Sequence, residues 1–340
     1  KPLFEYIDSI IFFDGETALA SLIERIEGGR DLSSVPNILY REGDHLRRSE
    51  VYHREDINEL PPPSFDGFPL TDYFSPIVIL PLQTARGCYW SRCTFCAIPY
   101  GEGPSFRSRD PDRVVEDMIS LKSLYCTQHF EFVDDAIPPQ KLRHISRELI
   151  SRDLDFRWAA EVRLEPQFSA ELLTQMHEGG CRILYFGLES ANPRILALMD
   201  KGTDITTGQR VLSDSHEAGI WNHVYVFFGF PTETEEEAEN TIQFIKKNNP
   251  VIDSVGFGQF LLYRHSKIHE NYQDFGITKI LERKSPFSFI FDYEIKNGMN
   301  NKQIKTCENR MKDFVYNESG DLAPYYEWLA MIPLIKGEVK

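Results

Sequence analysis

Alternating strand-like and helical segments constrain the fold of this chain more than any other feature of its sequence. Apolar, strand-like runs recur six times, at residues 77–84, 130–135, 156–163, 182–189, 221–229 and 254–262. Helical patterns lie between them, and strands that alternate with helices favour a parallel sheet. Because crossovers between parallel strands are right-handed, six such units predict an α/β fold of the partial (β/α)6 TIM-like barrel type.

Capping signals mark where several of the intervening helices begin. Asp110 followed by Pro111 pairs a capping aspartate with proline at the first helical position. Ser169 begins another helical pattern. Thr206-x-x-Gln209 and Thr234-x-x-Glu237 both have the spacing of a capping box, which predicts two further helix starts.

Smaller units are predicted on both sides of the barrel. A strand at 10–13 and a helix at 18–26 form one βα step, which cannot build a sheet alone, so we expect it to be the end of a larger domain. We therefore divide the chain into an N-terminal α/β remnant with its linker (1–62), a core barrel (63–275) and a C-terminal extension (276–340).

Charge and cysteine usage exclude several classes of function. The net charge is −15, which argues against broad contact with nucleic acid phosphates, and Arg107-Ser108-Arg109 is the nearest local basic patch. No apolar run is long enough to span a bilayer. Six cysteines are too few for a disulfide framework, which favours a reducing, cytoplasmic location, and Cys126, Cys181 and Cys307 are expected to be buried.

The other three cysteines form a cluster of metal-ligating residues. Cys88, Cys93 and Cys96 lie within nine residues. Three thiolates can hold three corners of a four-iron cluster and leave the fourth iron open for a second ligand. The alternative is a zinc knuckle, which would need a fourth ligand from elsewhere, such as His129 or His144.

Polar residues occur at the ends of the next predicted strands. They are Asp134 and Asp135, Glu161 and Arg163, Glu189 and Ser190, and Gly229 in a Gly-Phe-Pro turn. Ligands of parallel α/β sheets bind at the C-terminal ends of the strands. The cysteines follow the first strand, so the pattern predicts one ligand site at this end of the sheet.

The motifs on these strand ends resemble those of the radical SAM superfamily, and more narrowly of its cobalamin-binding branch. They are Arg86-Gly87-Cys88 through Cys96, Phe132-Val133-Asp134-Asp135, Gly187-Leu188-Glu189-Ser190, Lys201-Gly202-Thr203 and Gly229-Phe230-Pro231-Thr232-Glu233-Thr234. The N-terminal Asp14-Gly15-Glu16-Thr17 step is similar to the last βα unit of that branch's cobalamin domain.

The chain departs from the usual pattern of that superfamily at two points. Four residues separate Cys88 from Cys93, where the superfamily usually has three, although variants with a longer gap exist. The branch also has an Asp-x-His-x-x-Gly loop beside its cobalt, and this chain lacks it. Cobalamin is therefore expected only in a longer, full-length protein.

The resemblance implies two cofactors, a [4Fe-4S] cluster held by Cys88, Cys93 and Cys96, and S-adenosylmethionine (SAM) chelating the open iron. An electron from the reduced cluster would cleave SAM to a 5′-deoxyadenosyl radical, which abstracts hydrogen from a substrate. The reductant would be a flavodoxin or a ferredoxin.

The resemblance also implies roles for the strand-end residues, each with a structural alternative. Asp134 and Asp135 would accept the methionyl ammonium or cap a helix. Arg163 would bind the methionyl carboxylate or form a salt bridge with Glu161, which is expected on the same face of the strand.

Further roles concern the nucleoside part of SAM. Glu189 and Ser190 would contact the ribose, while Gly229 would allow close approach to the adenine or only make a turn. Phe95 would pack near the adenine, which is compatible with ordinary loop packing. His223, Tyr225 and Gln259 are expected to face the barrel lumen, where a histidine can equally be a core residue.

The predicted function is radical SAM chemistry, with cobalamin-dependent C-methylation of a peptide or natural product as the specific hypothesis. One alternative is modification of tRNA or another nucleic acid, which the acidic composition disfavours. A second alternative is a metal-stabilised interaction module without catalysis, which would need none of the polar strand ends.

Overall fold

A computed structural model describes residues 2–73, 75–98, 106–285, 287–319 and 323–324. Within these residues, seven parallel strands form one sheet in the order β15-β11-β10-β9-β8-β7-β4. The strands are β4 (Ile79–Leu82), β7 (His129–Phe132), β8 (Arg157–Arg163), β9 (Cys181–Glu189), β10 (Trp221–Phe228), β11 (Ser254–Gln259) and β15 (Ala323–Pro324). Each of the six predicted strands is present and all are neighbours in chain order, which confirms the predicted parallel α/β core.

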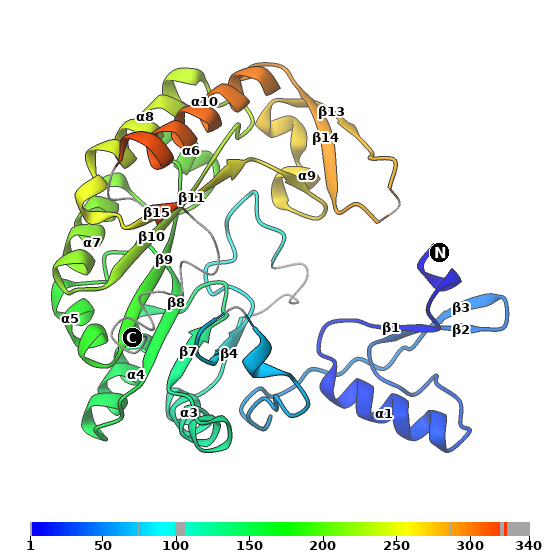
Figure 1. Ribbon diagram of the computed structural model, residues 1–340. Helices are drawn as coiled ribbons and strands as arrows, with labels where there is room; N and C mark the ends of the chain where they lie inside the picture. The colour runs from blue at the N-terminus through cyan, green and yellow to red at the C-terminus, as the bar shows by residue number, and fades with distance from the viewer. Residues whose placement is uncertain (1, 74, 99–105, 286, 320–322, 325–340) are drawn as a thin grey trace.

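The sheet curves, and helices cover its convex side (Figure 1). They are α3 (Pro111–Tyr125), α4 (Pro139–Ser151), α5 (Ala170–Glu178), α6 (Pro193–Leu198), α7 (Ile205–Glu217), α8 (Glu235–Lys247) and α10 (Asn301–Asp313). The main core lies between sheet and helices and includes the fully buried Phe130, Trp158 and Phe186. Among the described residues no pairing joins β4 to β11 or β15, so the barrel is open along that side.

The helix starts follow the capping signals, with one exception. Asp110 caps α3, Ser169 caps α5, and Thr234 forms the predicted capping box with Glu237 at α8. The predicted box at Thr206 is wrong, because the Asp204 side chain accepts the N–H of Thr207 and starts α7 two residues earlier.

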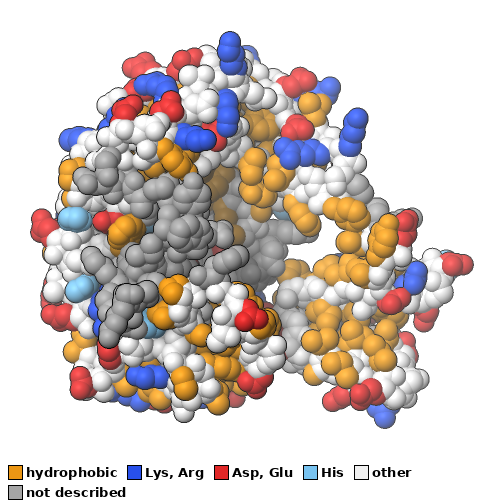
Figure 2. Space-filling model, in the orientation of Figure 1, with side chains coloured by type: hydrophobic (Ala, Val, Ile, Leu, Met, Phe, Trp, Pro, Cys, Tyr) orange, Lys and Arg blue, Asp and Glu red, His pale blue; other side chains and the backbone are white. Residues whose placement is uncertain are grey.

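A small N-terminal unit lies beside the barrel (Figure 1). Its elements are a 3-10 turn (Pro2–Glu5), β1 (Ser9–Ile11), α1 (Glu16–Glu27), β2 (Ile38–Glu42) and β3 (His45–Arg48). The three strands pair antiparallel in the order β1-β2-β3. Hydrophobic side chains gather on the visible face of this unit (Figure 2), and Leu19, Ile23 and Ile26 of α1 are about half exposed or more, at 52%, 49% and 63%.

The C-terminal segment is more ordered than the irregular extension that the sequence predicts. Its elements are β12 (Leu262–Tyr263), α9 (Lys267–Glu270), β13 (Ile277–Leu281), β14 (Ile290–Ile295), α10 and β15. The strands β12, β14 and β13 form an antiparallel sheet, and β15 joins the main sheet beside β11. Residues 325–340 lie outside the described part of the chain.

Short 3-10 and π segments and one small β pair complete the described elements. They are Leu70–Asp72, Asn249–Val251, Tyr272–Phe275, Phe314–Glu318, β5 (Ala85–Arg86) and β6 (Arg107–Ser108). Among the helices that the structure describes, none has both the length and the apolar character needed to cross a membrane.

Candidate cluster and SAM site

The three clustered cysteines line one cavity at the C-terminal ends of the strands. The cavity has a volume of about 500 Å3, and Cys88, Cys93 and Cys96 are all in its wall. Their loop follows β4 and β5 and is fastened to the segment after α6: the Thr94 N–H donates to the Met199 carbonyl (2.9 Å), and its hydroxyl donates to the Leu198 carbonyl (2.9 Å). The loop therefore has a fixed place over the sheet.

The three thiols do not form a compact set of ligand atoms for a single zinc ion. A zinc ion holds its sulfur ligands about 2.3 Å away, which places tetrahedral sulfurs about 4 Å from one another. Within the described residues, the one group of three histidine, cysteine or carboxylate ligand atoms that lie within 4.8 Å of one another is Asp112, His144 and Glu148. The three thiols are not in that group, so at least one pair of them is more than 4.8 Å apart.

The histidines that could complete a zinc knuckle lie elsewhere. His144 belongs to α4 and contacts Asp112 of α3 at 2.6 Å. His129 begins β7 and so lies at the opposite end of the sheet from the cysteine loop. Burial raises the pKa of the Cys96 thiol to about 12. A bound iron would offset this by favouring the thiolate form.

Three carboxylates from consecutive strands face the same cavity. Asp135 follows β7, Glu161 is in β8, Glu189 ends β9, and all three line the cavity wall. Burial, followed by the neighbouring Asp135 and Glu189 carboxylates, raises the pKa of Glu161 to about 7, with Lys201 acting against them. Glu189 has a left-handed φ of 65°, a strained backbone of the kind that functional sites often contain.

Two cations complete the polar lining. Lys201 is buried, and its Nζ donates to Glu189 Oε1 at 2.8 Å. Arg163 is also buried, and its Nε contacts Glu165 Oε1 at 2.7 Å while Nη2 donates to the Lys201 carbonyl. The predicted Glu161–Arg163 salt bridge is therefore wrong: both residues line the cavity, as strand alternation implied, but the partner of Arg163 is Glu165, beyond the strand end.

Phe95 lines the cavity and packs edge-on against Phe227, with ring centroids 5.2 Å apart. Phe227 and Tyr225 extend the wall along β10, opposite Gly256 and Gly258 of β11. The site thus combines an apolar side with an acidic side.

Three predicted site residues lie outside the cavity wall. Both Asp134 oxygens accept the N–H of Thr84 (3.0 Å each), so this buried side chain holds the strand that leads into the cysteine loop. The Ser190 hydroxyl accepts the N–H of Asn192 at 3.1 Å. Gly229 has φ 85° in a turn, and its N–H donates to Glu233 at 2.6 Å. Each of these contacts matches a structural role.

Further predictions concern the lumen and the remaining cysteines. His223 and Tyr225 share the inner face of β10, with ring centroids 4.5 Å apart, and burial lowers the pKa of His223 to about 3. Gln259 was expected in the lumen but is exposed and donates to Glu308 of α10 at 2.6 Å. Cys181 and Cys307 are buried as predicted, whereas Cys126 is exposed in the left-handed residue that ends α3.

Sequence reasoning did not single out Lys201 or Trp90 as site residues. Lys201 appeared only as part of the Lys-Gly-Thr motif, and its approach to Glu189 depends on the path of the chain after α6. Trp90 lies between Cys88 and Cys93, in the gap that is one residue longer than is usual in the superfamily. That extra length is the one sequence feature that points to Trp90.

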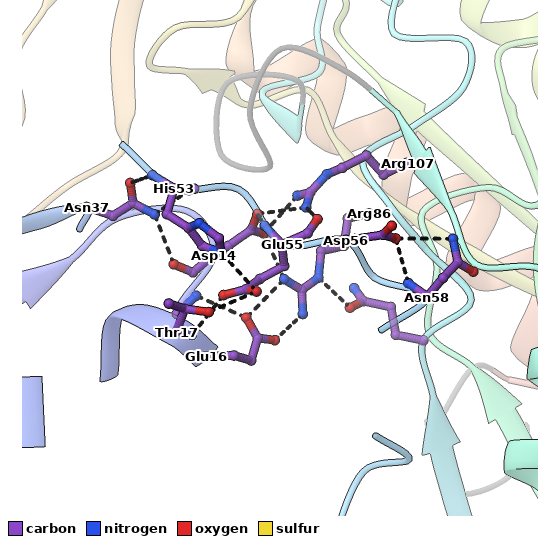
Figure 3. A network of polar contacts seen from close by, with 12 residues as sticks. Asp14, Glu16, Thr17, Asn37, His53, Glu55, Asp56, Asn58, Arg86 and Arg107 are labelled. Carbon is purple, nitrogen blue, oxygen red and sulfur yellow. Dashed lines mark hydrogen bonds and ion pairs between the residues drawn. The ribbon is translucent and has the colours of Figure 1, made fainter. Parts of the chain in front are cut away.

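Both arginines of the predicted basic patch, Arg107 and Arg109, form ion pairs with aspartates of this chain. Arg107 contacts Asp14 Oδ2 at 2.7 Å, and Arg109 contacts Asp117 at 2.6 Å. Figure 3 shows Asp14 between Arg107 and Arg86, which is 2.7 Å from Asp14 Oδ1. This network joins the N-terminal unit to the barrel and does not present arginine to a polyanion.

Comparison with known proteins supports the family suggested by the motifs. The model of the radical SAM superfamily matches residues 82–245. An uncharacterized methyltransferase of Pyrococcus horikoshii is 32% identical over 245 residues, which are 71% of this chain and 53% of that protein. The bacteriochlorophyllide d C-12(1)-methyltransferase of Chlorobaculum tepidum is 29% identical over 175 residues, 50% of this chain and 38% of that protein. The chain therefore spans about half the length or less of these curated relatives.

Two solved structures share the fold. The cobalamin-dependent SAM radical enzyme OxsB superposes with a TM-score of 0.70 at 15% identity, covering 90% of this chain and 51% of OxsB. The radical SAM methyltransferase TsrM from Kitasatospora setae gives 0.63 at 19% identity, covering 98% of this chain and 66% of TsrM. The matched segment contains every cavity-lining cysteine and carboxylate described above, and this chain belongs to the radical SAM superfamily.

Proposed function

We propose that this chain is the catalytic core of an enzyme that binds a [4Fe-4S] cluster through Cys88, Cys93 and Cys96 and cleaves SAM reductively. One observation carries the proposal: three thiols and three strand-end carboxylates line a single cavity of about 500 Å3. Three thiolates from one loop leave the fourth position of a [4Fe-4S] cluster open for SAM, whereas a zinc ion would need a fourth protein ligand. When bound, the cluster supplies the electron that breaks a carbon–sulfur bond of SAM.

The charge of the cavity suits SAM, whose sulfonium and ammonium outnumber its one carboxylate. Asp135, Glu161 and Glu189 give the wall three acidic groups, of which Glu189 pairs with Lys201, while the other cation, Arg163, pairs with Glu165. Carboxylates aimed at an ammonium make strong, charge-assisted hydrogen bonds. Binding of a cation beside Glu161 would also lower the pKa that burial and its acidic neighbours raise.

Individual residues can then be assigned to parts of SAM. Asp135 and Glu161 would accept the ammonium, and Glu189 would accept ribose hydroxyl protons. Lys201 could move from Glu189 to the methionyl carboxylate, because its Nζ is a flexible point charge at the cavity wall. Phe95 and Phe227 would cover the adenine and exclude water.

Space for a substrate lies on the β11 side of the cavity. Among the residues that the structure describes, a Cβ added to Gly258 would meet no atom within 4 Å, so this part of the described wall has room for a further group. Tyr225 of β10 borders the same region. We propose that a small molecule or peptide enters here and that the full protein transfers a methyl group, with cobalamin bound outside this chain and a flavodoxin or ferredoxin as reductant. The similarity to a methyltransferase supports this finer assignment.

Anaerobic reconstitution with iron and sulfide tests the cluster. The chain should take up about four irons and absorb broadly near 400 nm, as thiolate-bound clusters do. Replacing Cys88, Cys93 and Cys96 together by alanine should remove nearly all of this iron. The matched control is Cys126→Ser, because Cys126 is exposed and lies outside the cavity. Unchanged iron content in the triple variant would overturn the assignment.

Catalysis is tested separately from cluster binding. The reduced, reconstituted chain should convert SAM to methionine and 5′-deoxyadenosine, measured by chromatography. A chain that holds the cluster but neither binds nor cleaves SAM would be a metal-stabilised module, and the enzymatic part of the proposal would be wrong.

A further inference from the structure

The four residues between Cys88 and Cys93 are held from several directions. Tyr89 packs edge-on against Phe106, with ring centroids 6.0 Å apart. Ser91 has a left-handed φ of 48°, and its hydroxyl donates to the Cys88 carbonyl. Lys267 of α9 donates to the carbonyls of Ser91 (3.2 Å) and Arg92 (2.9 Å). This gap, one residue longer than is usual in the superfamily, is therefore a docked segment.

Trp90 makes the most extensive of these contacts. Its ring lies between two guanidinium groups, with Arg163 at 4.1 Å and Arg92 at 4.8 Å from the ring centroid. The indole N–H donates to the Asp200 carbonyl at 2.7 Å, and Arg92 makes a bidentate contact with the Asp200 carboxylate (3.1 and 2.9 Å). Guanidinium groups stack favourably on tryptophan, more so where water is excluded.

Gly202 shows how closely this ring approaches the neighbouring chain. A Cβ at Gly202 would lie 2.2 Å from the Trp90 ring, and the backbone there has φ 71°. Any side chain at this position would displace the indole. The same chain segment carries Lys201, and the Lys201 carbonyl accepts a hydrogen bond from Arg163.

Trp90 thus contacts both cationic parts of the cavity wall. Arg163 lies on its face, and the chain that carries Lys201 lies against its edge. None of the Trp90 atoms is needed to bind a metal, and Trp90 is not among the residues that line the cavity. Its contacts fix where the cysteine loop sits relative to Arg163 and Lys201.

We propose that Trp90 is a positioning residue, which sets the distance between the cluster thiols and the cations of the cavity. The four-residue gap between Cys88 and Cys93 allows its ring to insert between Arg163 and Arg92, against Gly202. What the thiols hold rests on the proposed function, but the packing of the loop does not. The consequence is testable on the chain both without and with its cluster.

The first experiment measures thiol reactivity in the cluster-free, reduced chain. The background carries Cys126→Ser, because exposed Cys126 would otherwise dominate the reaction, whereas Cys181 and Cys307 are buried. In Trp90→Ala the loop thiols should react with a disulfide reagent about tenfold faster, as expected for loss of a desolvated cation–π contact and a hydrogen bond. Trp90→Phe keeps a ring and should give a smaller increase.

Trp221→Phe is the matched control. Trp221 also donates an indole hydrogen bond, to the Ser254 hydroxyl at 2.9 Å, but it begins β10 at the far end of the sheet. In Trp221→Phe the thiols of the cysteine loop should react at the wild-type rate. If Trp90→Ala is folded and its thiols also react at the wild-type rate, the positioning role is wrong.

The second experiment uses the reconstituted chain and compares two glycine variants. Gly202→Ala and Gly43→Ala both place alanine at a positive φ (71° and 59°), but a Cβ at Gly43 meets no atom of the described part of the chain within 4 Å. Gly202→Ala should weaken equilibrium binding of SAM about tenfold and shift the midpoint potential of the cluster, because Arg163 and Lys201 lose their fixed distance from the thiols. Gly43→Ala should change neither.

The two proposals fail in different ways. If no variant, nor the wild type, binds a cluster, the proposed function is wrong, and the thiol-reactivity experiment still decides the role of Trp90. If the cluster binds but Gly202→Ala and Gly43→Ala have the same SAM affinity and potential, the positioning role is wrong and the proposed function stands.

Discussion

Two polar clusters of this molecule are built from the same residue types and have opposite electrostatic characters. Where the N-terminal unit meets the barrel, the Asp14 carboxylate lies between Arg86 and Arg107 and also accepts the N–H of Glu55 at 2.9 Å (Figure 3). In the cavity, Glu161 has the Asp135 and Glu189 carboxylates as neighbours. One carboxylate is fully paired, and the other lies among like charges.

The pKa directions follow from this difference. Burial acts to raise the pKa of Asp14, but hydrogen bonds from Arg107 and Arg86 outweigh it and bring the pKa to about 2. Burial and the neighbouring carboxylates raise the pKa of Glu161 to about 7, and Lys201 opposes them only in part. A saturated ion pair stabilises a fixed contact, whereas perturbed carboxylates clustered in a cavity are typical of a ligand site, as proposed above.

Removing Asp14 should lower the stability of the chain. Asp14→Asn leaves Arg107, which is 16% exposed, without its carboxylate partner, and leaves Arg86, which is 15% exposed, with Glu16 alone. Breaking a buried pair typically costs 3–5 kcal/mol, and partial exposure reduces this to about 2–3 kcal/mol. The loss is measured by urea denaturation, and faster proteolysis of the linker that follows the N-terminal unit would show that the unit has separated.

The pH dependence of this effect has a defined sign. Because the pKa of Asp14 is lowered, its stabilisation is present above the ordinary value of 3.8 and is lost as the pH falls through about 2. Wild type and Asp14→Asn should therefore converge in acid. Asp8→Asn is the control, since Asp8 pairs with Arg41 at 92% exposure and should change stability by less than about 0.5 kcal/mol. Equal effects of the two substitutions at neutral pH would contradict the comparison.

Glu161→Gln should have the opposite sign. The pKa of Glu161 is raised from 4.5 to about 7, so ionisation lowers stability progressively as the pH rises through that range. The variant avoids this loss and should be about 3 kcal/mol more stable than wild type at pH 8, the full conversion of a shift of about 2.5 pKa units, and equal to it near pH 4. Denaturation at the two pH values measures the difference.

Binding of SAM should reverse the stability advantage of Glu161→Gln over wild type. SAM should stabilise the reconstituted wild type more than Glu161→Gln, because the ammonium loses an acceptor. Glu42→Gln is the matched control: Glu42 pairs with Arg47 on the surface, and both are more than half exposed. A gain at pH 8 as large in Glu42→Gln as in Glu161→Gln would show that the cavity is not the cause.

The fold was largely predictable because its signal is local and repeated. Buried parallel strands are continuous apolar runs, and the predicted ranges 156–163 and 182–189 agree with β8 and β9 to within one residue at each end. The antiparallel sheet after β11 was missed, because its strands are short and half exposed and give no long apolar run. Thr206 failed as a cap because Asp204, two residues earlier, competed for the same backbone.

The sequence predicts which strand ends form the site, but not which side chains at those ends point into the cavity. Asp134 and Asp135 both lie beyond Phe132, where β7 and its alternation end, so the sequence could not tell that Asp134 turns to Thr84 while Asp135 lines the cavity. Likewise Lys201 reaches Glu189 through the path of a loop, and such tertiary contacts leave no periodic pattern.

Gln259→Ala should have the smallest effect on stability and on SAM binding, and it tests where the cavity ends. Strand alternation suggested that Gln259 faces the lumen, but its side chain is exposed and reaches Glu308 of α10. Loss of one exposed hydrogen bond should change stability by less than about 1 kcal/mol and leave SAM binding unchanged. Tyr225→Ala, on the neighbouring strand, removes a ring from the cavity wall and should weaken SAM or substrate binding severalfold. Tyr225 pairs with Gly256, three residues before Gln259 on the adjacent strand. A binding defect in Gln259→Ala equal to that in Tyr225→Ala would therefore mean that the cavity extends past the end of β11, and isothermal titration of both variants distinguishes the two cases.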